Sequence, residues 1–149
     1  MKRSDMPMPT EGIIVTHFAV AEDIARTARF YSDVLGGTFV FAAPGAPTFV
    51  KLANTWVIIN VGGGPTPDKP NTVLATPSAG ATVDAFMNIR VADIQAVYDD
   101  WTAKGADFIT PPLDNGGYEL RCYLRDPDGR IIEVGQSTGM IDFFEFTDK

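Results

Sequence analysis

The segment Arg121–Gly135 reads RCYLRDPDGRIIEVG, and it decides the expected fold. Its centre, Asp126–Gly129, is Asp-Pro-Asp-Gly, which is typical of a tight turn because proline presets φ, aspartate bonds nearby backbone and glycine accepts a positive φ. Apolar and polar side chains alternate on either side of this turn, as in a hairpin with one buried face. We therefore predict a β-hairpin in which the Glu133 carboxylate points away from the core, beside Arg121 and Tyr123.

The first half of the chain has the pattern of a β-α-β-β-β module. An apolar, β-branched strand is followed by Asp23, a typical helix N-cap. Apolar residues then recur at helical spacing until Gly36 and Gly37 end the helix, and three short β-rich runs follow. The predicted elements are a strand at 12–20, a helix at 23–35 and strands at 39–41, 48–52 and 56–61.

The second half repeats this order. Asp93 again begins a helix and Gly105 ends it, and Asp93 follows Asp23 at an offset of 70 residues. The pair Val134-Gly135 follows Val61-Gly62 at an offset of 73 residues, as expected when loops differ between two copies of one unit. The predicted elements are a strand at 83–91, a helix at 93–104 and strands at 108–109, 119–125 and 130–135.

A connection rich in glycine and proline separates the two halves. Residues 62–80 contain four of each, so we predict a linker or a functional flap there rather than a regular element. The predicted organisation is a first βαβββ module at 12–64, a linker at 65–81, a second βαβββ module at 82–137 and an apolar C-terminal tail at 138–149.

Two motifs carry a resemblance to a known family. One is the hairpin Arg121–Gly135, and the other is Phe30–Gly37, which reads FYSDVLGG. With the duplicated module, they resemble the vicinal oxygen chelate superfamily, which includes glyoxalase I, bleomycin and fosfomycin resistance proteins and extradiol dioxygenases. The resemblance covers nearly the whole chain. It implies an α+β fold in which two βαβββ modules form a curved, cup-shaped mixed sheet with helices on the outside.

The resemblance also implies a divalent metal ion at the mouth of the cup, with one ligand from each of four strands. His17 and Glu133 match two of these ligand positions, and Glu133 would also be the catalytic base. Asn60 aligns with Glu133 through the Val-Gly pair that follows each, and Phe86 stands where the second module would supply a histidine. The expected cofactor is one zinc, nickel, manganese or iron ion at a degenerate site, with no nucleotide cofactor.

The sequence leaves the orientation of the His17 side chain open. Alternation puts Phe18 and Val20 on the core face and leaves His17 with Ala19 on the other, but a slip of one residue turns His17 into the core. The chain has a single histidine, so it cannot form the two-histidine, one-carboxylate iron site of an extradiol dioxygenase. We therefore do not expect that activity.

Further side chains are expected to bind a substrate on the open face of the cup. Arginine offers a planar fork for carboxylate or phosphate oxygens, and aromatic rings offer an apolar wall. The predicted substrate-binding residues are Trp56, Asn60, Phe86, Asn88, Arg90, Arg121 and Tyr123. The alternative is that Arg121 and Arg125 only pair with Glu119 and Asp126 on a solvated face of the sheet.

Two functions are compatible with this pattern. In the first, a glyoxalase-like lyase, isomerase or transferase acts on a small oxygenated molecule with His17 and Glu133 as metal ligands. In the second, a metal-free protein of the bleomycin-resistance type binds and sequesters a small molecule. Metal content distinguishes the two.

Composition bounds the partners. The chain has 149 residues and a net charge of −7, which is sufficient for a full core and unfavourable for nucleic acid. It has one cysteine and no run of about 18 apolar residues, so we expect a cytoplasmic protein without a membrane span. The segment Met140–Phe146 carries three phenylalanines, from which we predict a homodimer that covers them.

Overall fold

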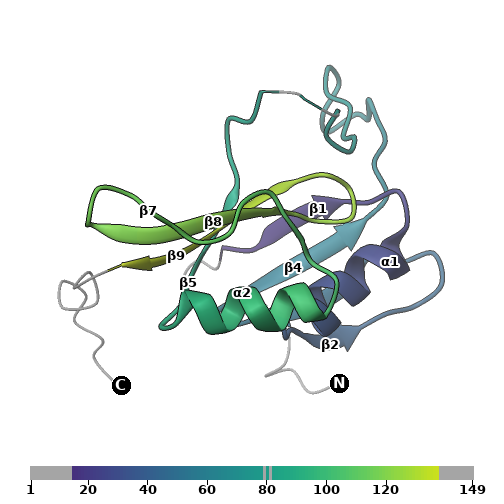
Figure 1. The fold of residues 1–149 in the computed structure, drawn as a ribbon. Helices are drawn as coiled ribbons and strands as arrows, with labels where there is room; N and C mark the ends of the chain where they lie inside the picture. Colours follow the sequence, from purple (N-terminus) through teal and green to yellow (C-terminus); the bar gives the residue numbers. More distant parts are fainter. Residues whose placement is uncertain (1–14, 79, 81, 138–149) are drawn as a thin grey trace, which may run out of the picture. The chain divides into compact units, whose positions relative to one another are not determined.

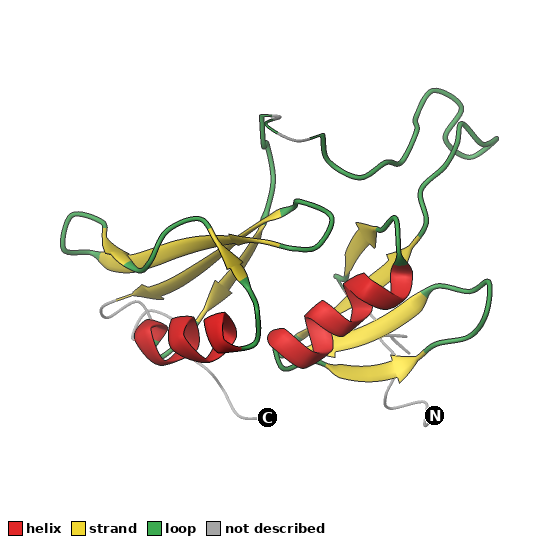
Figure 2. Ribbon diagram, turned by 45° about the vertical axis from the view of Figure 1, so that its right-hand side comes forward, coloured by secondary structure: helices red, strands yellow, loops and turns green. Residues whose placement is uncertain are grey.

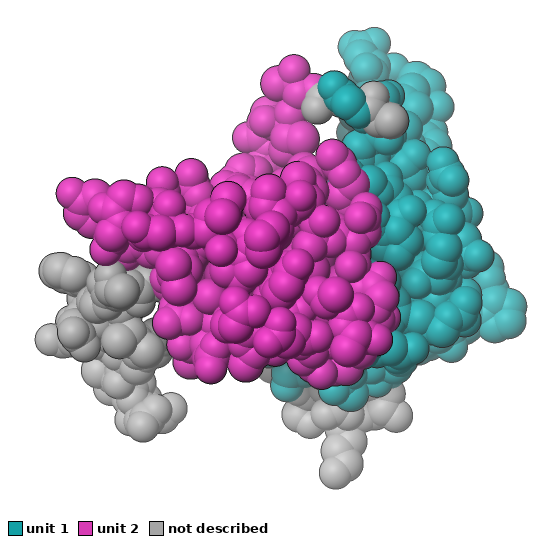
Figure 3. All heavy atoms as spheres, in the orientation of Figure 1, with its two compact units in different colours: residues 1–81, 126–130 teal, residues 82–125, 131–149 magenta. Residues whose placement is uncertain are grey.

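The computed structural model of the chain describes residues 15–78, 80 and 82–137, and it divides into two compact units. Unit 1 consists of residues 1–81 and 126–130, and unit 2 consists of residues 82–125 and 131–149 (Figure 3). Each unit has a mixed β-sheet with a helix along one face (Figure 2), which confirms the predicted α+β class. The predicted tail at 138–149 lies outside the described residues.

Within the described residues, unit 1 contains four strands and a helix that continues directly into a π-helix (Figure 1). The strands pair in the order β1-β4-β3-β2, with β1 parallel to β4 and the other pairs antiparallel. The elements are β1 (His17–Val20), α1 (Ile24–Arg29), η2 (Phe30–Val34), β2 (Thr38–Phe41), β3 (Thr48–Leu52) and β4 (Thr55–Asn60). The predicted order of elements is therefore correct for this unit.

The helical segment begins where the sequence predicts, but its second part is a π-helix. Asp23 caps α1, because its Oδ1 accepts a hydrogen bond from Arg26 N at 3.0 Å. In η2, Leu35 N donates to Phe30 O at 3.2 Å, which is the i to i−5 spacing of a π-helix. None of the described helices is long and apolar enough to cross a membrane.

Helix α1 covers only one face of the unit 1 sheet. On β1, Ala19 is 0% exposed and Phe18 is 47% exposed, so the two faces of the strand differ sharply. The buried core on the helix side includes Ala19, Ala28, Tyr31, Val50, Val57 and Ile59. The other side, which we call the open face of unit 1, carries Phe18, Phe41, Phe49 and Ile58.

Unit 2 repeats the arrangement with one additional short strand among its described residues. Its strands pair in the order β5-β9-β8-β6, with β7 added to β8 and with β5 parallel to β9. The elements are β5 (Met87–Arg90), α2 (Ile94–Ala103), β6 (Asp107–Phe108), β7 (Leu113–Asp114), β8 (Glu119–Arg125) and β9 (Ile131–Ser137). All of these except β7 match predicted segments.

The helix of unit 2 is capped like that of unit 1 and covers one face of its sheet. Asp93 Oδ1 accepts a hydrogen bond from Ala96 N at 2.9 Å. The buried core comprises Ile94, Trp101, Cys122, Leu124, Ile132 and Val134. The opposite side, which we call the open face of unit 2, carries Asn88, Arg90, Glu119, Arg121, Tyr123 and Glu133.

The turn between β8 and β9 belongs to unit 1, where charged hydrogen bonds hold it. Asp126 is buried and accepts hydrogen bonds from Tyr31 OH at 3.1 Å and from Arg130 Nη1 at 2.7 Å. Asp128 Oδ2 accepts a hydrogen bond from Thr27 Oγ1 at 2.5 Å. The Asp-Pro-Asp-Gly turn is therefore fixed to α1 and η2 by buried polar groups.

Candidate functional site

Glu133 lies at the centre of the open face of unit 2. It is buried on β9, between the neighbouring strands β5 and β8. Its Oε1 accepts a hydrogen bond from Asn88 Nδ2 at 2.5 Å, and its Oε2 accepts one from Tyr123 OH at 2.6 Å. Arg90 Nη2 lies 3.5 Å from Oε1. Both carboxylate oxygens are therefore engaged by donors from the two flanking strands.

Arg90 bridges two carboxylates across the sheet. Its Nη1 donates to Glu119 Oε2 at 2.6 Å, while its Nη2 approaches Glu133. The guanidinium passes over Gly135, where an added Cβ would overlap Nη1. Glu119 and Gly135 were not among the predicted site residues. Alternation along β8 could have indicated Glu119, and a glycine inside a strand is a signal of close approach.

We call the side chains around Glu133 the Glu133 cluster, and they are Asn88, Arg90, Glu119, Arg121 and Tyr123. The rim of this cluster is half-exposed and combines cationic and aromatic groups. The side chains of Arg90 and Arg121 are 43% and 38% exposed. Arg121 Nη1 lies 3.4 Å from Glu119 Oε1, and its guanidinium carbon lies 6.0 Å from the centre of the Tyr123 ring. Phe86 meets Tyr123 edge to face, with ring centres 6.2 Å apart. The pairing of Arg121 with Glu119 therefore occurs, but as a long contact at the solvent-facing rim.

The cluster changes the titration of two of its members. The hydrogen bond to Glu133, together with burial and the carboxylate charge, raises the pKa of Tyr123 above 10.0. The hydrogen bond from Arg90 lowers the pKa of the Glu119 carboxyl below 4.5. At neutral pH Tyr123 is therefore a protonated hydrogen-bond donor, and Glu119 is ionised beside Arg90.

The sequence alignment of Asn60 with Glu133 is wrong. Ala21 N donates to Asn60 O at 2.8 Å in unit 1, and Val91 N donates to Gly135 O at 3.0 Å in unit 2. Asn60 therefore corresponds to Gly135. The Val-Gly pair that guided the alignment lies two residues further along the strand in unit 1 than in unit 2, because the two strands end differently relative to their parallel partners.

Ile58 is the residue of unit 1 that corresponds to Glu133. The parallel pairing of β1 with β4 and of β5 with β9 gives this match, and the antiparallel pairing of each hairpin agrees. In the same way, four more residues of unit 1 correspond to residues of unit 2: Phe18 to Asn88, Val20 to Arg90, Phe49 to Tyr123, and Asn60 to Gly135. The position that carries a carboxylate in unit 2 is thus apolar in unit 1.

His17 lies on the helix side of its sheet and not on the open face, so of the two orientations that the sequence left open, the structure has the one directed to the core. It pairs in register with Val57 and alternates with Ala19, and both of these residues are fully buried on the helix side. Burial and the charge of Arg130 lower the pKa of the imidazole. The prediction weighted the larger Phe18 toward the core, whereas the small Ala19 lies under the helix because it lets the helix approach the sheet.

The predicted substrate-binding residues fall into two groups. Trp56 and Asn60 lie on β4 of unit 1, where Trp56 is largely buried and Asn60 Oδ1 accepts a hydrogen bond from Val61 N at 2.9 Å. The others gather on the open face of unit 2, and they are Phe86, Asn88, Arg90, Arg121 and Tyr123. That these five side chains bind a ligand stays a prediction.

The residues present do not fit a divalent metal ion. In the part of the chain that the structure describes, no three His, Cys, Asp or Glu side chains form a group that could hold one. A guanidinium already approaches Glu133 Oε1, and its positive charge opposes a second cation at that oxygen. Glu133 therefore acts as the acceptor of a hydrogen-bond network in this arrangement.

Comparisons with known proteins agree with this fold. The sequence matches the Glyoxalase/Bleomycin resistance protein/Dioxygenase superfamily over residues 14–134. No curated protein sequence matches the chain. Among solved structures, a glyoxalase/bleomycin resistance protein/dioxygenase from Nocardioides is similar with a TM-score of 0.68 and 20% identity, over 92% of this chain and 91% of that one.

Two further solved structures share the fold at low identity. TioX from Micromonospora sp. ML1 has a TM-score of 0.65 and 20% identity, over 85% of this chain and 100% of its own. TnmS3, an antibiotic binding protein from Streptomyces sp. CB03234, has a TM-score of 0.61 and 17% identity, over 88% of this chain and 100% of its own. At these identities the similarity concerns the fold.

Proposed function

The chain belongs to the Glyoxalase/Bleomycin resistance protein/Dioxygenase superfamily, and we propose that it binds a small oxygenated molecule on the open face of unit 2 without a resident metal ion. The observation that carries this proposal is the hydrogen-bond network of Glu133. Asn88, Arg90 and Tyr123 occupy the carboxylate oxygens with which a metal ion would have to bind. Such a protein would sequester its ligand and leave it chemically unchanged.

The rim of the cluster indicates the class of ligand. Arg121 has a half-exposed planar guanidinium, and Phe86 has a half-exposed ring beside Tyr123. A guanidinium fork suits carbonyl, phenolate or carboxylate oxygens, and the aromatic edge suits a flat apolar body. The two arginines of the cluster are balanced by Glu119 and Glu133, so the ligand we propose is a flat aromatic molecule that is neutral or carries one negative charge.

A structural neighbour supports a binding function. TnmS3 is described as an antibiotic binding protein, and it has the same fold as this chain. The competing proposal is a glyoxalase-like lyase or isomerase with Glu133 as its base. That chemistry depends on a metal-held substrate, and the donors around Glu133 oppose a metal ion at this position.

Metal analysis and ligand titration test the proposal together. The protein, purified without chelators, should contain no stoichiometric zinc, nickel, manganese or iron, and it should bind 2-naphthoate in a calorimetric titration. Arg121→Ala and Phe86→Ala should each weaken this binding about five- to thirtyfold, because each removes a contact worth about 1–2 kcal/mol. Lys104→Ala, at the exposed C-cap of α2, is the control and should leave the affinity unchanged.

Stoichiometric metal that is lost together with a lyase or isomerase activity would overturn the binding proposal. Naphthoate affinity that is equal in the Arg121 and Lys104 variants would show that binding does not use the open face of unit 2.

We also propose a cytoplasmic homodimer. Cys122 is the only cysteine and is a buried free thiol, which suits a reducing compartment. In unit 2, Leu113 and Tyr118 expose most of their surface, and apolar groups of this kind favour association with a second copy. A dimeric mass in sedimentation equilibrium at micromolar concentration would support this proposal, and a monomeric mass would contradict it.

A further inference from the structure

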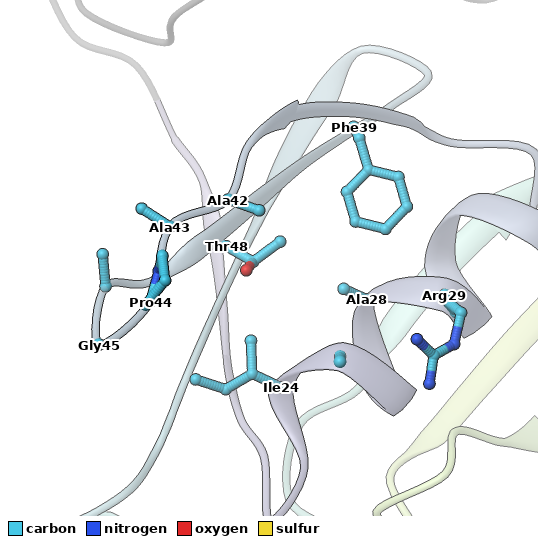
Figure 4. Close-up of a pocket in the computed structure, with 11 residues that line it drawn as sticks. Ile24, Ala28, Arg29, Phe39, Ala42, Ala43, Pro44, Gly45 and Thr48 are labelled. Carbon is cyan, nitrogen blue, oxygen red and sulfur yellow. The ribbon is translucent and has the colours of Figure 1, made fainter.

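A cavity lies in unit 1, on the helix side of its sheet (Figure 4). It has a volume of about 450 Å³, which is within the range of sites for small molecules. It lies between helix α1 and the hairpin formed by β2 and β3. Its lining includes five alanines, which are Ala25, Ala28, Ala42, Ala43 and Ala46.

The order of the strands explains why this cavity exists. Helix α1 packs on β3 and β4, while β2 is an edge strand of the sheet. Phe39 on β2 pairs with Val50 and therefore points to the helix side, yet its side chain is 46% exposed. The small alanine side chains on the helix and the loop do not reach across to it. An apolar groove is therefore left beside the helix, with an aromatic ring as one wall.

Two polar groups line the same groove without a protein partner. The guanidinium of Arg29 and the hydroxyl of Thr48 form no hydrogen bond or ion pair with any described residue, and both residues line the cavity. Arg26, one turn earlier on the helix, is by contrast paired with Asp128 at 2.9 Å. Arg29 offers a guanidinium beside the groove and Thr48 offers a hydroxyl in its lining, and both groups can donate hydrogen bonds to an oxygen anion.

The geometry points to a second ligand site in this groove, for a small carboxylic acid whose carboxylate binds Arg29 and whose apolar body lies between the alanines and Phe39. The charge of Arg29 selects the anion, and the apolar walls select a ligand with a short chain or a single ring. The net charge of −7 on the chain disfavours anions in general, so recognition must come from this local cation and from burial of the apolar body. The site is independent of the open face of unit 2.

A titration of the full-length protein with 4-phenylbutyrate, followed by amide resonances in NMR spectra, tests the proposal. Saturable shifts are expected at residues 24–29 and 39–48. Arg29→Gln should lower the affinity for 4-phenylbutyrate two- to fivefold, as expected for loss of a solvent-exposed charge contact. The same variant should leave the affinity for the neutral 4-phenylbutanamide unchanged. Ala42→Leu fills the groove and should weaken the binding of both 4-phenylbutyrate and 4-phenylbutanamide.

Lys104→Gln is the matched control, because it removes an exposed cation from the C-cap of α2 in unit 2 and should change neither affinity. An Arg29→Gln variant with unchanged affinity for both ligands would overturn the assignment. So would shifts that are confined to residues 86–90 and 119–135, because the carboxylate would then bind at the open face of unit 2. The failure of naphthoate to bind that face would not affect the shifts expected at α1 and the β2–β3 hairpin.

Discussion

The open faces of the two units share one backbone arrangement and differ in their chemistry. In unit 2, Glu133 receives hydrogen bonds from both neighbouring strands. In unit 1, the equivalent position is Ile58, with Phe18 and Phe49 beside it. The core of each unit lies on the helix side of its sheet, and the side chains of the core have to be largely apolar and buried. The open face is free of this requirement, so it is where the two copies could acquire different functions.

The hairpin turns differ in the same way. In unit 1, the β3–β4 hairpin closes with the two residues Ala53 and Asn54. The β8–β9 hairpin closes with Asp126–Gly129, and Asp126 is buried in a network with Tyr31. One turn therefore only connects strands, whereas the other contributes buried charges to the core of unit 1.

Removing the buried carboxylate of the second turn should cause the largest loss of stability. Asp126→Ala removes the 2.7 Å partner of the largely buried Arg130 and leaves it only a 3.5 Å contact with Asp128, and breaking a buried ion pair in this way costs about 3 kcal/mol. Urea unfolding measures the free energy. Asp100→Ala removes the exposed partner of Lys104 and is the control, with an expected loss of about 0.5 kcal/mol or less. Equal losses in the two variants would mean that the turn is not a structural anchor.

Exchanging the central residues of the two open faces should have opposite consequences. Ile58→Glu places a carboxylate among apolar neighbours without donors, and it should cost about 2 kcal/mol of unfolding free energy. Glu133→Ile should cost less than about 1 kcal/mol, because Arg90 keeps its bond to Glu119 and remains partly solvated. A larger loss for Glu133→Ile than for Ile58→Glu would show that the network is mainly structural.

The same Glu133→Ile variant should lower the pKa of Tyr123. The hydrogen bond to Glu133 is the main cause that holds this pKa above 10.0, and the variant removes both the acceptor and the negative charge. Ultraviolet titration of tyrosinate measures the change as the difference between the two proteins. The Ile58→Glu variant should show no such change in Tyr123. An unaltered Tyr123 titration in Glu133→Ile would contradict the hydrogen bond between these side chains.

Filling the space over Gly135 should displace Arg90 without changing any charged residue. The equivalent position in unit 1 holds Asn60, where the neighbouring strand presents the short Val20. Gly135→Ala should lower the unfolding free energy by about 0.5–1 kcal/mol. The pKa of Glu119 should rise toward 4.5, because the hydrogen bond from Arg90 is the main cause that lowers it.

The pH dependence of this variant follows from the direction of the Glu119 shift. A carboxyl whose pKa is lowered on folding stabilises the native state above its unfolded pKa, and this contribution is lost as pH falls through the lowered folded pKa. The difference in unfolding free energy between the wild type and Gly135→Ala should therefore be largest near neutral pH and shrink on acidification. A difference that is constant with pH would show that Arg90 still reaches Glu119 in the variant.

The order of elements could be predicted because local signals and packing agree. Asp23 and Asp93 both cap helices as expected, and the alternation along β8 correctly placed Arg121 and Tyr123 on one face. The turn Asp126–Gly129 was predicted from its residue types alone. Its attachment to α1 in unit 1 was not, because no local pattern encodes a contact about 100 residues away in sequence.

The site was predictable where polar residues alternate with apolar ones, as around Glu133. It was not predictable on β1, where both faces are apolar and the small Ala19, rather than the larger Phe18, lies under the helix. The alignment of Asn60 with Glu133 was wrong for a different reason. A two-residue difference at the end of β4 shifted the alignment, and only the pairing register with β1 reveals that Ile58 matches Glu133.

The smallest expected effect concerns the backbone at the two hairpin corners. Ala53 has φ of 48° and is the only described non-glycine residue with a positive φ, while Gly129 in the other hairpin has φ of 88°. The left-handed conformation costs a residue with a Cβ about 1–2 kcal/mol, and glycine avoids this cost but loses about 0.5–1 kcal/mol more chain entropy on folding. Ala53→Gly should therefore raise the unfolding free energy by about 0.5 kcal/mol.

The mirror change at the second corner completes this test. Gly129→Ala should lower the unfolding free energy by about 1 kcal/mol through conformation alone, because nothing lies within 4 Å of the added Cβ. Urea unfolding of both variants measures the pair. If Ala53→Gly were destabilising, the side chain of Ala53 would have to contribute packing, and the first hairpin turn would be more than a connection between strands. Opposite signs for the two variants would show that both corners require the same backbone conformation, and that only the second copy carries the residue suited to it.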